Sequence, residues 1–226
     1  MSRIGIVTGL QMEACLVRPG RRVAGDRSLL VACDGPGPRR AYEAARRLVE
    51  AGADGLVSFG LAGGLDPELA PGTAILPVAI LDEDGSRFDC AEDWRRDLTA
   101  QAPRDPALQC VDVLATLSEP VASVEAKAAL RARTGASAAD MESAAVARAA
   151  MEAGLPFLAI RAISDRAGDT IPRAALKGMR ADGHAAALPV LVHLAAHPGE
   201  LGALIRLARQ TGRAKRALAA LAHRLG

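Results

Sequence analysis

The sequence predicts an α/β fold in three layers, with a central twisted mixed sheet flanked by helices. Two observations support this prediction. Short runs rich in Val, Ile and Leu recur along the chain, and stretches with apolar residues at helical spacing lie between them. Such uninterrupted apolar runs are typical of strands that are covered on both faces. Because 226 residues are enough for one buried core, we expect a single domain over residues 1–226.

The order of the expected elements follows from these runs. Strands are expected at residues 4–8, 29–33, 55–59, 73–81, 111–115, 137–140 and 157–163. Helices are expected at residues 39–51 and 143–153, and Gly154 and Pro156 end the second of them. Residues 82–105 are polar and predict a loop or insertion beside the site. From about residue 173 to the end we expect two closing helices, separated by a break at His197-Pro198-Gly199.

Composition excludes several classes of function. Lys and Arg exceed Asp and Glu by only two, whereas nucleic-acid-binding domains usually show a strong basic excess. The four cysteines form no Cys-x-x-Cys pair, so neither a zinc site nor a disulfide framework is expected. No run approaches the roughly 20 apolar residues of a membrane helix. We therefore expect a soluble, cytoplasmic protein with no metal and no cofactor.

Two glycine segments follow predicted strands. Gly60-Leu61-Ala62-Gly63-Gly64 is expected as a turn, and it either brings backbone amides close to a ligand or serves packing alone. Its spacing does not match the Gly-x-Gly-x-x-Gly pattern of dinucleotide-binding folds. Gly35-Pro36-Gly37-Pro38 precedes a helix, where an anion could bind, but a simple exit from the strand is the favoured interpretation.

Carboxylates lie where apolar runs end. Glu142 should stand near the N-terminus of the helix that starts at residue 143, where it could accept from two ribose hydroxyls; helix charge complementation is the alternative, and Asp140 fits that alternative better. Asp165 ends the longest apolar run, where a helix or turn cap is the competing interpretation. Ligands of open α/β sheets bind beyond such strand ends. We expect Glu13, Glu142 and Asp165 to converge at one edge of the sheet.

Several motifs resemble the nucleoside phosphorylase and nucleosidase superfamily over nearly the whole chain. They are Ile4-Gly5-Ile6-Val7 followed by Glu13, Ala62-Gly63-Gly64-Leu65, Asp140-Met141-Glu142-Ser143-Ala144-Ala145 and Arg161-Ala162-Ile163-Ser164-Asp165. Within this superfamily the chain is most similar to the hopanoid-associated phosphorylases, which are linked to the conversion of adenosylhopane to ribosylhopane with loss of adenine. The short central region, the scarcity of aromatic residues and the break before a basic last helix indicate this narrower resemblance.

The resemblance implies the roles of the site residues. Asp165 would be the acid that protonates or hydrogen-bonds the purine N7, with Ser164 orienting it. This requires a raised pKa, because the ordinary value for Asp is about 3.9. Glu142 and Met141 would hold the ribose. Backbone groups of Ala62 and Gly63 would approach the ligand.

The nucleophile decides between hydrolysis and phosphorolysis. By the same resemblance Glu13 would activate water. Arg161 is expected among the substrate-binding residues, where it would also keep Glu13 ionised. Phosphate is disfavoured, since like charges at about 4 Å repel by roughly 4 kcal/mol at an effective dielectric constant near 20. Many relatives carry a Ser or Thr hydroxyl at the position of Leu61, and this hydroxyl helps to hold the nucleophile. Leu61 cannot provide this hydrogen bond to water or to phosphate.

Three alternatives stay open at the sequence level. They are a phosphorolytic purine nucleoside phosphorylase, a methylthioadenosine or adenosylhomocysteine nucleosidase, and a nucleoside-binding module without catalysis. The expected partner is a small or lipid-linked purine nucleoside, and the expected assembly is a homodimer. Leucines of the last helix alternate with arginines, so peripheral contact with the inner face of a membrane is weighed against an ordinary packing helix.

Overall fold

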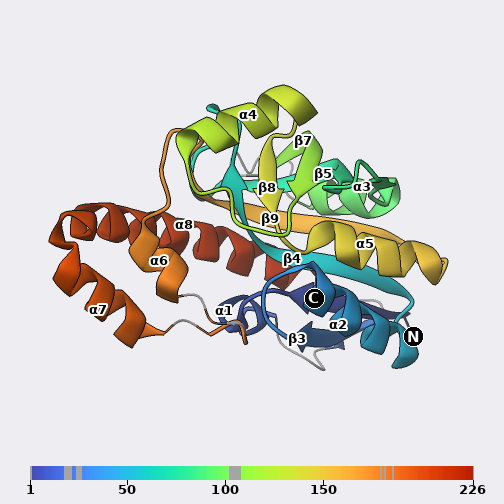
Figure 1. The fold of residues 1–226 in the computed structure, drawn as a ribbon. Helices are drawn as coiled ribbons and strands as arrows, with labels where there is room; N and C mark the ends of the chain where they lie inside the picture. The colour runs from blue at the N-terminus through green and yellow to red at the C-terminus, as the bar shows by residue number, and fades with distance from the viewer. Residues whose placement is uncertain are drawn as a thin grey trace.

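The computed structural model describes residues 2–17, 22–23, 27–101, 108–178, 180, 182–184 and 186–225. Within these residues nine strands form one mixed sheet (Figure 1). The strands are β1 (Ser2–Thr8), β2 (Arg22–Val23), β3 (Arg27–Cys33), β4 (Gly55–Gly64), β5 (Ala74–Leu81), β6 (Arg87–Asp89), β7 (Leu108–Thr116), β8 (Ala138–Asp140) and β9 (Phe157–Asp165). Their order is β2-β3-β1-β4-β8-β7-β5-β6, and β9 pairs with both β4 and β5.

The pairing of β9 closes part of the sheet on itself. β4 pairs with β8 and β9, β8 with β7, β7 with β5, and β5 with β9, so these five strands form a ring. The pairs β4–β9, β5–β7 and β7–β8 are parallel, whereas β4–β8 and β5–β9 are antiparallel. The predicted mixed sheet flanked by helices is therefore confirmed. The ring brings the ends of β4, β8 and β9 together.

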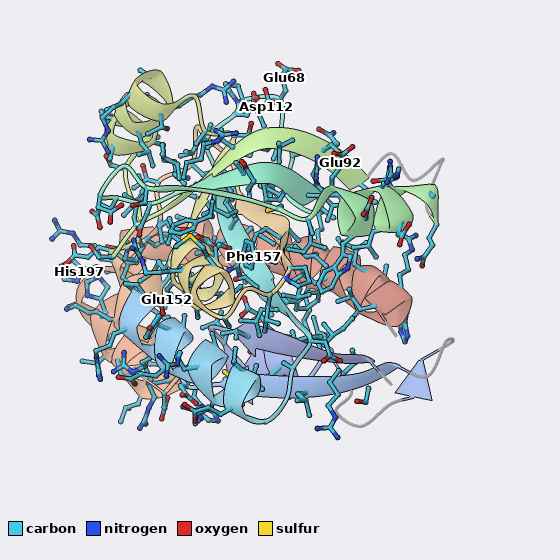
Figure 2. All side chains as sticks on the ribbon, turned by 90° about the vertical axis from the view of Figure 1, so that its right-hand side faces the viewer. Glu68, Glu92, Asp112, Glu152, Phe157 and His197 are labelled. Carbon is cyan, nitrogen blue, oxygen red and sulfur yellow. The ribbon has the colours of Figure 1, made fainter. Side chains whose placement is uncertain are left out.

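Helices cover the strands on both sides. α2 (Pro38–Glu50) packs on β1 and on α5 (Ser143–Glu152), while α8 (Leu201–Leu225) packs against β9 (Figure 1). β9 is buried at nearly every position because α5 and α8 both contact it. Phe157, the first residue of β9, is buried and lies near the middle of the view in Figure 2, whereas Glu68 and Asp112 lie at its upper edge. A strand buried in this way is expected to be mainly apolar. β9 is apolar from Phe157 to Ile160, and the charged residues Arg161 and Asp165 are its buried exceptions.

The expected glycine turn at residues 60–64 is wrong. These residues continue β4, which pairs with β9 up to Gly63 and shows an irregularity in register between Ala62 and Gly63. Gly60 and Gly64 are needed for close approach rather than for a turn. A Cβ on Gly64 would lie 2.8 Å from the Asp165 carbonyl oxygen. Glycine therefore lets β4 and the end of β9 run side by side into the site.

The predicted loop at residues 82–105 contains regular structure in its described part, which ends at residue 101: strand β6 and helix α3 (Glu92–Ala100). Residues 102–107 lie outside the described residues. Two further helices, α1 (Gln11–Ala14) and α4 (Val124–Thr134), are not among the predicted elements. α4 has clear end signals: the Ser123 side chain accepts from the Ala126 N–H at 3.1 Å, and Gly135 ends the helix with φ of 69°.

The C-terminal region departs from the expected two helices. It contains a short α6 (Arg173–Gly178), then α7 (Ala187–Ala196), a 3₁₀ turn at Pro198–Glu200 and α8. The predicted break at residues 197–199 is confirmed, and His197 marks it at the edge of Figure 2. Of the described helices, none has by itself the length and apolarity to cross a membrane. α7 and the segment Pro198–Leu225 meet that test of length and composition only as a pair, bent by 118°.

Candidate active site

A cavity of about 260 Å³ lies where β1, β4, β8 and β9 end. The predicted residues Glu13, Glu142 and Asp165 all line it. Met141, Ser164, Ala62 and Gly63 line it as well. The expected convergence of carboxylates from distant parts of the chain is thus present in the structure.

The Glu13 carboxylate lies on α1, one short turn after β1 ends. Its Oε2 accepts from the N–H groups of Gly9 at 3.1 Å and Leu10 at 2.9 Å, and its Oε1 accepts from the Leu61 N–H at 2.9 Å. Burial raises the pKa of Glu13, although Arg161 and the three backbone donors oppose the rise. The carboxylate is therefore held rigidly by backbone at one wall of the cavity.

Glu142 directly precedes α5 and lies next to Gly9, the residue after β1. Its Oε1 accepts from the Gly37 N–H at 3.1 Å, so the second glycine segment faces a carboxylate of the protein itself. Burial raises the pKa of Glu142 to about 7, helped by Asp140 and Glu13 and opposed by Arg161. A Cβ on Gly9 would lie 2.8 Å from Glu142 Oε1, which explains a glycine directly after β1.

Arg161 lies behind the carboxylates. Its guanidinium is 2.6 Å from Asp140 and 3.6 Å from Glu142, and it donates to the hydroxyls of Ser58 and Ser143. Burial would lower the pKa of Arg161, but the surrounding carboxylates outweigh it and raise that pKa. The side chain is 1 % exposed and is not among the described residues that line the cavity. Arg161, which was expected to bind substrate, thus lies behind the residues that line the cavity.

Asp140 lies just before α5 and hydrogen-bonds the first residue of that helix. Its carboxylate accepts from the Ser143 N–H at 3.2 Å and from the Thr116 hydroxyl at 2.7 Å. Thr116 in turn accepts from the Ala144 N–H at 3.0 Å. These bonds fix the turn between β8 and α5, and with it the backbone of Met141 and Glu142.

Asp165 ends β9 and is buried. Its Oδ1 accepts from the Ser164 hydroxyl at 2.6 Å, which agrees with the orienting role expected of Ser164. Its Oδ2 forms an ion pair with Lys127 Nζ. Both oxygens of the carboxylate are therefore positioned by donors of the protein.

Lys127 is a site residue that sequence reasoning missed. It lies on α4 and lines the cavity beside Asp165. One local signal in the sequence indicates this residue. Ser123, Glu125 and Gly135 are typical of the two ends of a helix, and Lys127 lies on the same face of that helix as the buried Leu130. No sequence pattern, however, connects this lysine with a carboxylate 38 residues away.

The rest of the cavity wall is mainly aliphatic. It includes Leu61, Leu65, Leu117, Val121, Ile171, Leu176 and Leu207. None of the described lining residues is aromatic, so aliphatic side chains and backbone would face a bound ring. α6 contributes Leu176 and α8 contributes Leu207, which places the C-terminal region at the wall of the cavity.

Comparisons with known proteins agree with this fold. Residues 21–188 match the model of the Phosphorylase superfamily. No curated protein matches the chain significantly. An S-adenosylhomocysteine nucleosidase from Streptococcus pyogenes, in complex with 5-methylthiotubericidin, is similar in structure at 20 % identity, over 100 % of this chain and 98 % of that chain, with a TM-score of 0.71.

Two further solved structures are similar. A 5′-methylthioadenosine/S-adenosylhomocysteine nucleosidase from Colwellia psychrerythraea, in complex with adenine, shares 22 % identity over 74 % of this chain and 84 % of that chain, with a TM-score of 0.65. A futalosine hydrolase of Helicobacter pylori shares 17 % identity over 97 % of each chain, with a TM-score of 0.69. These likenesses concern the fold. Because the family model covers well over half of its residues, the chain belongs to the phosphorylase superfamily.

Proposed function

We propose that this protein hydrolyses the N-glycosidic bond of a purine nucleoside, and that its substrate is adenosylhopane, which would lose adenine to give ribosylhopane in hopanoid side-chain biosynthesis. One observation carries the proposal: Glu13, Glu142 and Asp165 line the same cavity. The similar structures include nucleosidases for adenosine derivatives, one of them in complex with adenine. Family membership supports the same class of reaction.

The roles follow from position. Cleavage of an N-glycosidic bond requires a proton for the leaving base and stabilisation of an oxocarbenium-like ribose, as in glycoside hydrolysis. Asp165, oriented by Ser164, would protonate the purine N7. Glu142 would accept hydrogen bonds from the ribose hydroxyls, with Met141 beside it. Glu13, held by three backbone N–H groups, would activate water.

The charge of the cavity favours water over phosphate. Five described lining residues are carboxylic: Glu13, Glu119, Asp140, Glu142 and Asp165. The one cationic residue among the described lining residues, Lys127, already donates to Asp165, to the Arg166 carbonyl and to the Asp169 carbonyl. A phosphate ion would thus meet several carboxylates without a cation to offset them. Leu61 offers its backbone N–H to Glu13 and no hydroxyl to a phosphate.

The aliphatic wall supports a substrate with an apolar 5′ substituent. Its leucines and Ile171 would contact such a group, and binding would remove their surface from water. A methylthioadenosine or adenosylhomocysteine nucleosidase remains the competing proposal, since those substrates also carry a 5′ substituent. The discriminating quantity is the relative kcat/KM for the lipid and the small nucleosides.

The experiment incubates the protein with adenosylhopane, methylthioadenosine and adenosylhomocysteine, each with and without phosphate. Adenine release and the sugar product are followed by mass spectrometry. We expect free ribosylhopane at a rate that does not depend on phosphate. Release that requires phosphate would replace hydrolysis by phosphorolysis, and preference for a small nucleoside would replace the lipid substrate.

The variant Asp165→Asn distinguishes an enzyme from a nucleoside-binding module without catalysis. If the protein is an enzyme, the variant should still bind adenine, measured by calorimetry, while adenine release falls by about 10²- to 10⁴-fold, the usual contribution of a general acid. Wild-type protein that binds adenosylhopane but releases no adenine would favour the binding module.

An exposed apolar surface on α7 and the start of α8 supports contact with a membrane. Of the six exposed large hydrophobic residues in the described chain, five lie on α7 and the start of α8: Leu188, Leu191, Val192, Leu201 and Ile205. The first three are 72 %, 62 % and 63 % exposed. After residue 182 the only acidic residue is Glu200, whereas six Lys and Arg residues follow it. We propose that this apolar and basic surface lies on the inner, anionic face of a membrane, from the cytoplasmic side.

This placement revises the expectation for the last helix. Leu218, Leu221 and Leu225 are buried in the core, so the second half of α8 is a packing helix and α7 supplies the exposed apolar face. Co-sedimentation with phosphatidylglycerol vesicles tests the proposal, with phosphatidylcholine vesicles for comparison. Replacing Leu188, Leu191 and Val192 by Ser should abolish binding, whereas Met151→Ser, at an exposed position of α5, should not. A triple variant that instead converts a homodimer into a monomer would assign this face to the proposed dimer.

A further inference from the structure

Lys127 is the buried ionisable group whose position calls for an explanation. Its side chain is 1 % exposed, and Nζ has three hydrogen-bond acceptors: Asp165 Oδ2, the Arg166 carbonyl at 2.7 Å and the Asp169 carbonyl at 2.9 Å. An ammonium group carries three N–H donors, so each one has an acceptor. Burying an ammonium is costly unless it is paired in this way.

The partner of Lys127 is the carboxylate that the proposed reaction needs as an acid. An ionised carboxylate only accepts hydrogen bonds, and a purine ring nitrogen with a lone pair also accepts. Asp165 can therefore assist the leaving base only if a proton is delivered to it. Ser164 engages Oδ1, and Lys127 engages Oδ2 with its ammonium group. Lys127 is thus the ionisable donor in direct contact with the proposed acid.

We propose that Lys127 supplies the proton that Asp165 passes to the departing purine. As the bond between ribose C1′ and purine N9 breaks, its electron pair goes to the base, and N7 takes a proton from Asp165. Lys127 Nζ transfers a proton to Asp165 and becomes a neutral amine. Water adds its oxygen to C1′ and gives a proton to Glu13, and exchange with solvent returns a proton to Lys127 and removes one from Glu13.

The step rests on the proposed nucleoside cleavage, but it concerns a residue of α4 that lies outside the carboxylate motifs. A purely structural role would be to anchor the loop after β9, because Lys127 also binds the carbonyls of Arg166 and Asp169. The two roles differ in their dependence on pH. An anchor slows the reaction equally at every pH, whereas a proton supplier can be replaced by protons from solution.

The first experiment compares the pH dependence of kcat in wild type and Lys127→Met, using the best adenine nucleoside of the wild-type protein. Without Lys127, Asp165 can act only where it takes up a proton from solution. We expect kcat of the variant to be about 10²- to 10⁴-fold lower near pH 8, with KM changed much less. The ratio of variant to wild-type kcat should rise at least about tenfold as the pH falls to about 5.5. A ratio that is constant with pH overturns the proposal.

Matched controls address folding and coupling. Arg133→Met removes a positive charge at an exposed position of the same helix, α4, and should leave the pH profile unchanged. Circular dichroism verifies that Lys127→Met is folded. If Lys127 acts through Asp165, the double variant Lys127→Met/Asp165→Asn should be no slower than Asp165→Asn alone. Fully multiplicative losses would mean that the two residues act independently.

A second measurement does not depend on turnover. The chain has three lysines, Lys127, Lys177 and Lys215, so the Nζ signals of ¹⁵N-lysine-labelled protein can be assigned by substitution. Saturating adenine should shift the Lys127 signal and leave the Lys215 signal in place. A Lys127 signal that does not move at millimolar adenine overturns the inference. Wild-type protein that releases no adenine, but whose Lys127 signal moves, would instead count against the proposed function alone.

Discussion

At the scale of single residues, the site gathers negative charge around a few buried cations. Arg161 is 2.6 Å from Asp140 and 3.6 Å from Glu142, and its charge also stabilises the ionised form of Glu13. The Glu13 carboxylate is nevertheless buried, and so is Glu142, so their protons are held more tightly than in water. Stability and activity should both respond to pH in the range where these groups titrate.

Glu142 gives a prediction about stability. The folded chain raises its pKa from 4.5 to about 7, so between these values the folded state binds more protons than the unfolded state. The free energy of unfolding should therefore fall as the pH rises through this window, by roughly 3 kcal/mol at most for this group. Urea unfolding of wild type and Glu142→Gln measures it. In Glu142→Gln the free energy of unfolding should change less with pH than in wild type. Glu43→Gln, at an exposed position of α2, should keep the wild-type dependence on pH. Equal slopes for Glu142→Gln and wild type would contradict the assignment.

Gly60 gives a prediction about packing. A Cβ there would lie 2.8 Å from Glu13 Oε1 and would also collide with the Arg161 guanidinium. Gly60→Ala should lower the free energy of unfolding by about 1–3 kcal/mol and reduce adenine release, because both charged groups must shift. Gly212→Ala is the matched control, since its Cβ would meet open space within α8, where alanine should stabilise by up to about 1 kcal/mol. An unchanged free energy of unfolding in Gly60→Ala would contradict the steric conflict with Glu13 and Arg161.

At the scale of elements, the site depends on strands that end together and on helices that begin there. β4 and β9 run side by side from Leu56 to Gly63, so Gly63 and Asp165 reach the same point. α5 starts directly after β8 and presents Glu142. α4 presents Lys127 from the other side of Asp165. Each functional side chain is thus one or two residues from an element boundary, or on a helix fixed by its caps.

The N-terminus of α4 can be tested on its own. The Ser123 hydroxyl accepts from the Ala126 N–H at 3.1 Å and satisfies one free donor of the helix. Ser123→Ala should lower the free energy of unfolding by about 1 kcal/mol, and Ser123→Thr, which keeps a hydroxyl, should lower it less. Chemical denaturation provides the values. Identical stabilities of the Ala and Thr variants would indicate that the cap contributes nothing.

At the scale of the whole molecule, the cavity is shared by distant parts of the chain. Glu13 comes from the first helix, Glu142 and Asp165 from the middle, and Leu207 from the last helix. One large core cluster joins β1, β4, β9 and α8 behind this cavity. We therefore expect that a ligand in the cavity contacts elements that unfold together.

Adenine should accordingly stabilise the molecule as one unit. A ligand that binds only the folded state adds about 2.7 kcal/mol at 100 times its Kd. Calorimetry should show a single transition whose Tm rises with adenine concentration, while cytosine at the same concentrations has no effect. A second transition that adenine leaves unmoved would show that part of the chain unfolds separately.

Much of the fold could be predicted from the sequence because it depends on local pattern. The apolar runs at residues 4–8, 55–59 and 157–163 lie within β1, β4 and β9. The prediction of a turn at residues 60–64 is wrong, since glycines that allow two strands to pack closely resemble those of a turn in sequence. The polar composition of residues 82–105 did not predict α3, because Leu98 is the residue of this helix that is buried.

The sequence by itself determined seven of the nine described strands, the helices α2 and α5, and the carboxylates at element ends, because hydrophobic periodicity and element boundaries are local properties. Only the tertiary structure decided which charges meet. Arg161 forms ion pairs with Asp140 and Glu142, and Lys127 forms one with Asp165. The leucines of α7 are exposed, whereas those at the end of α8 are buried. All three features depend on how elements far apart in the chain pack. For the two cations the reason is that a buried ion is costly unless a partner lies within hydrogen-bond distance.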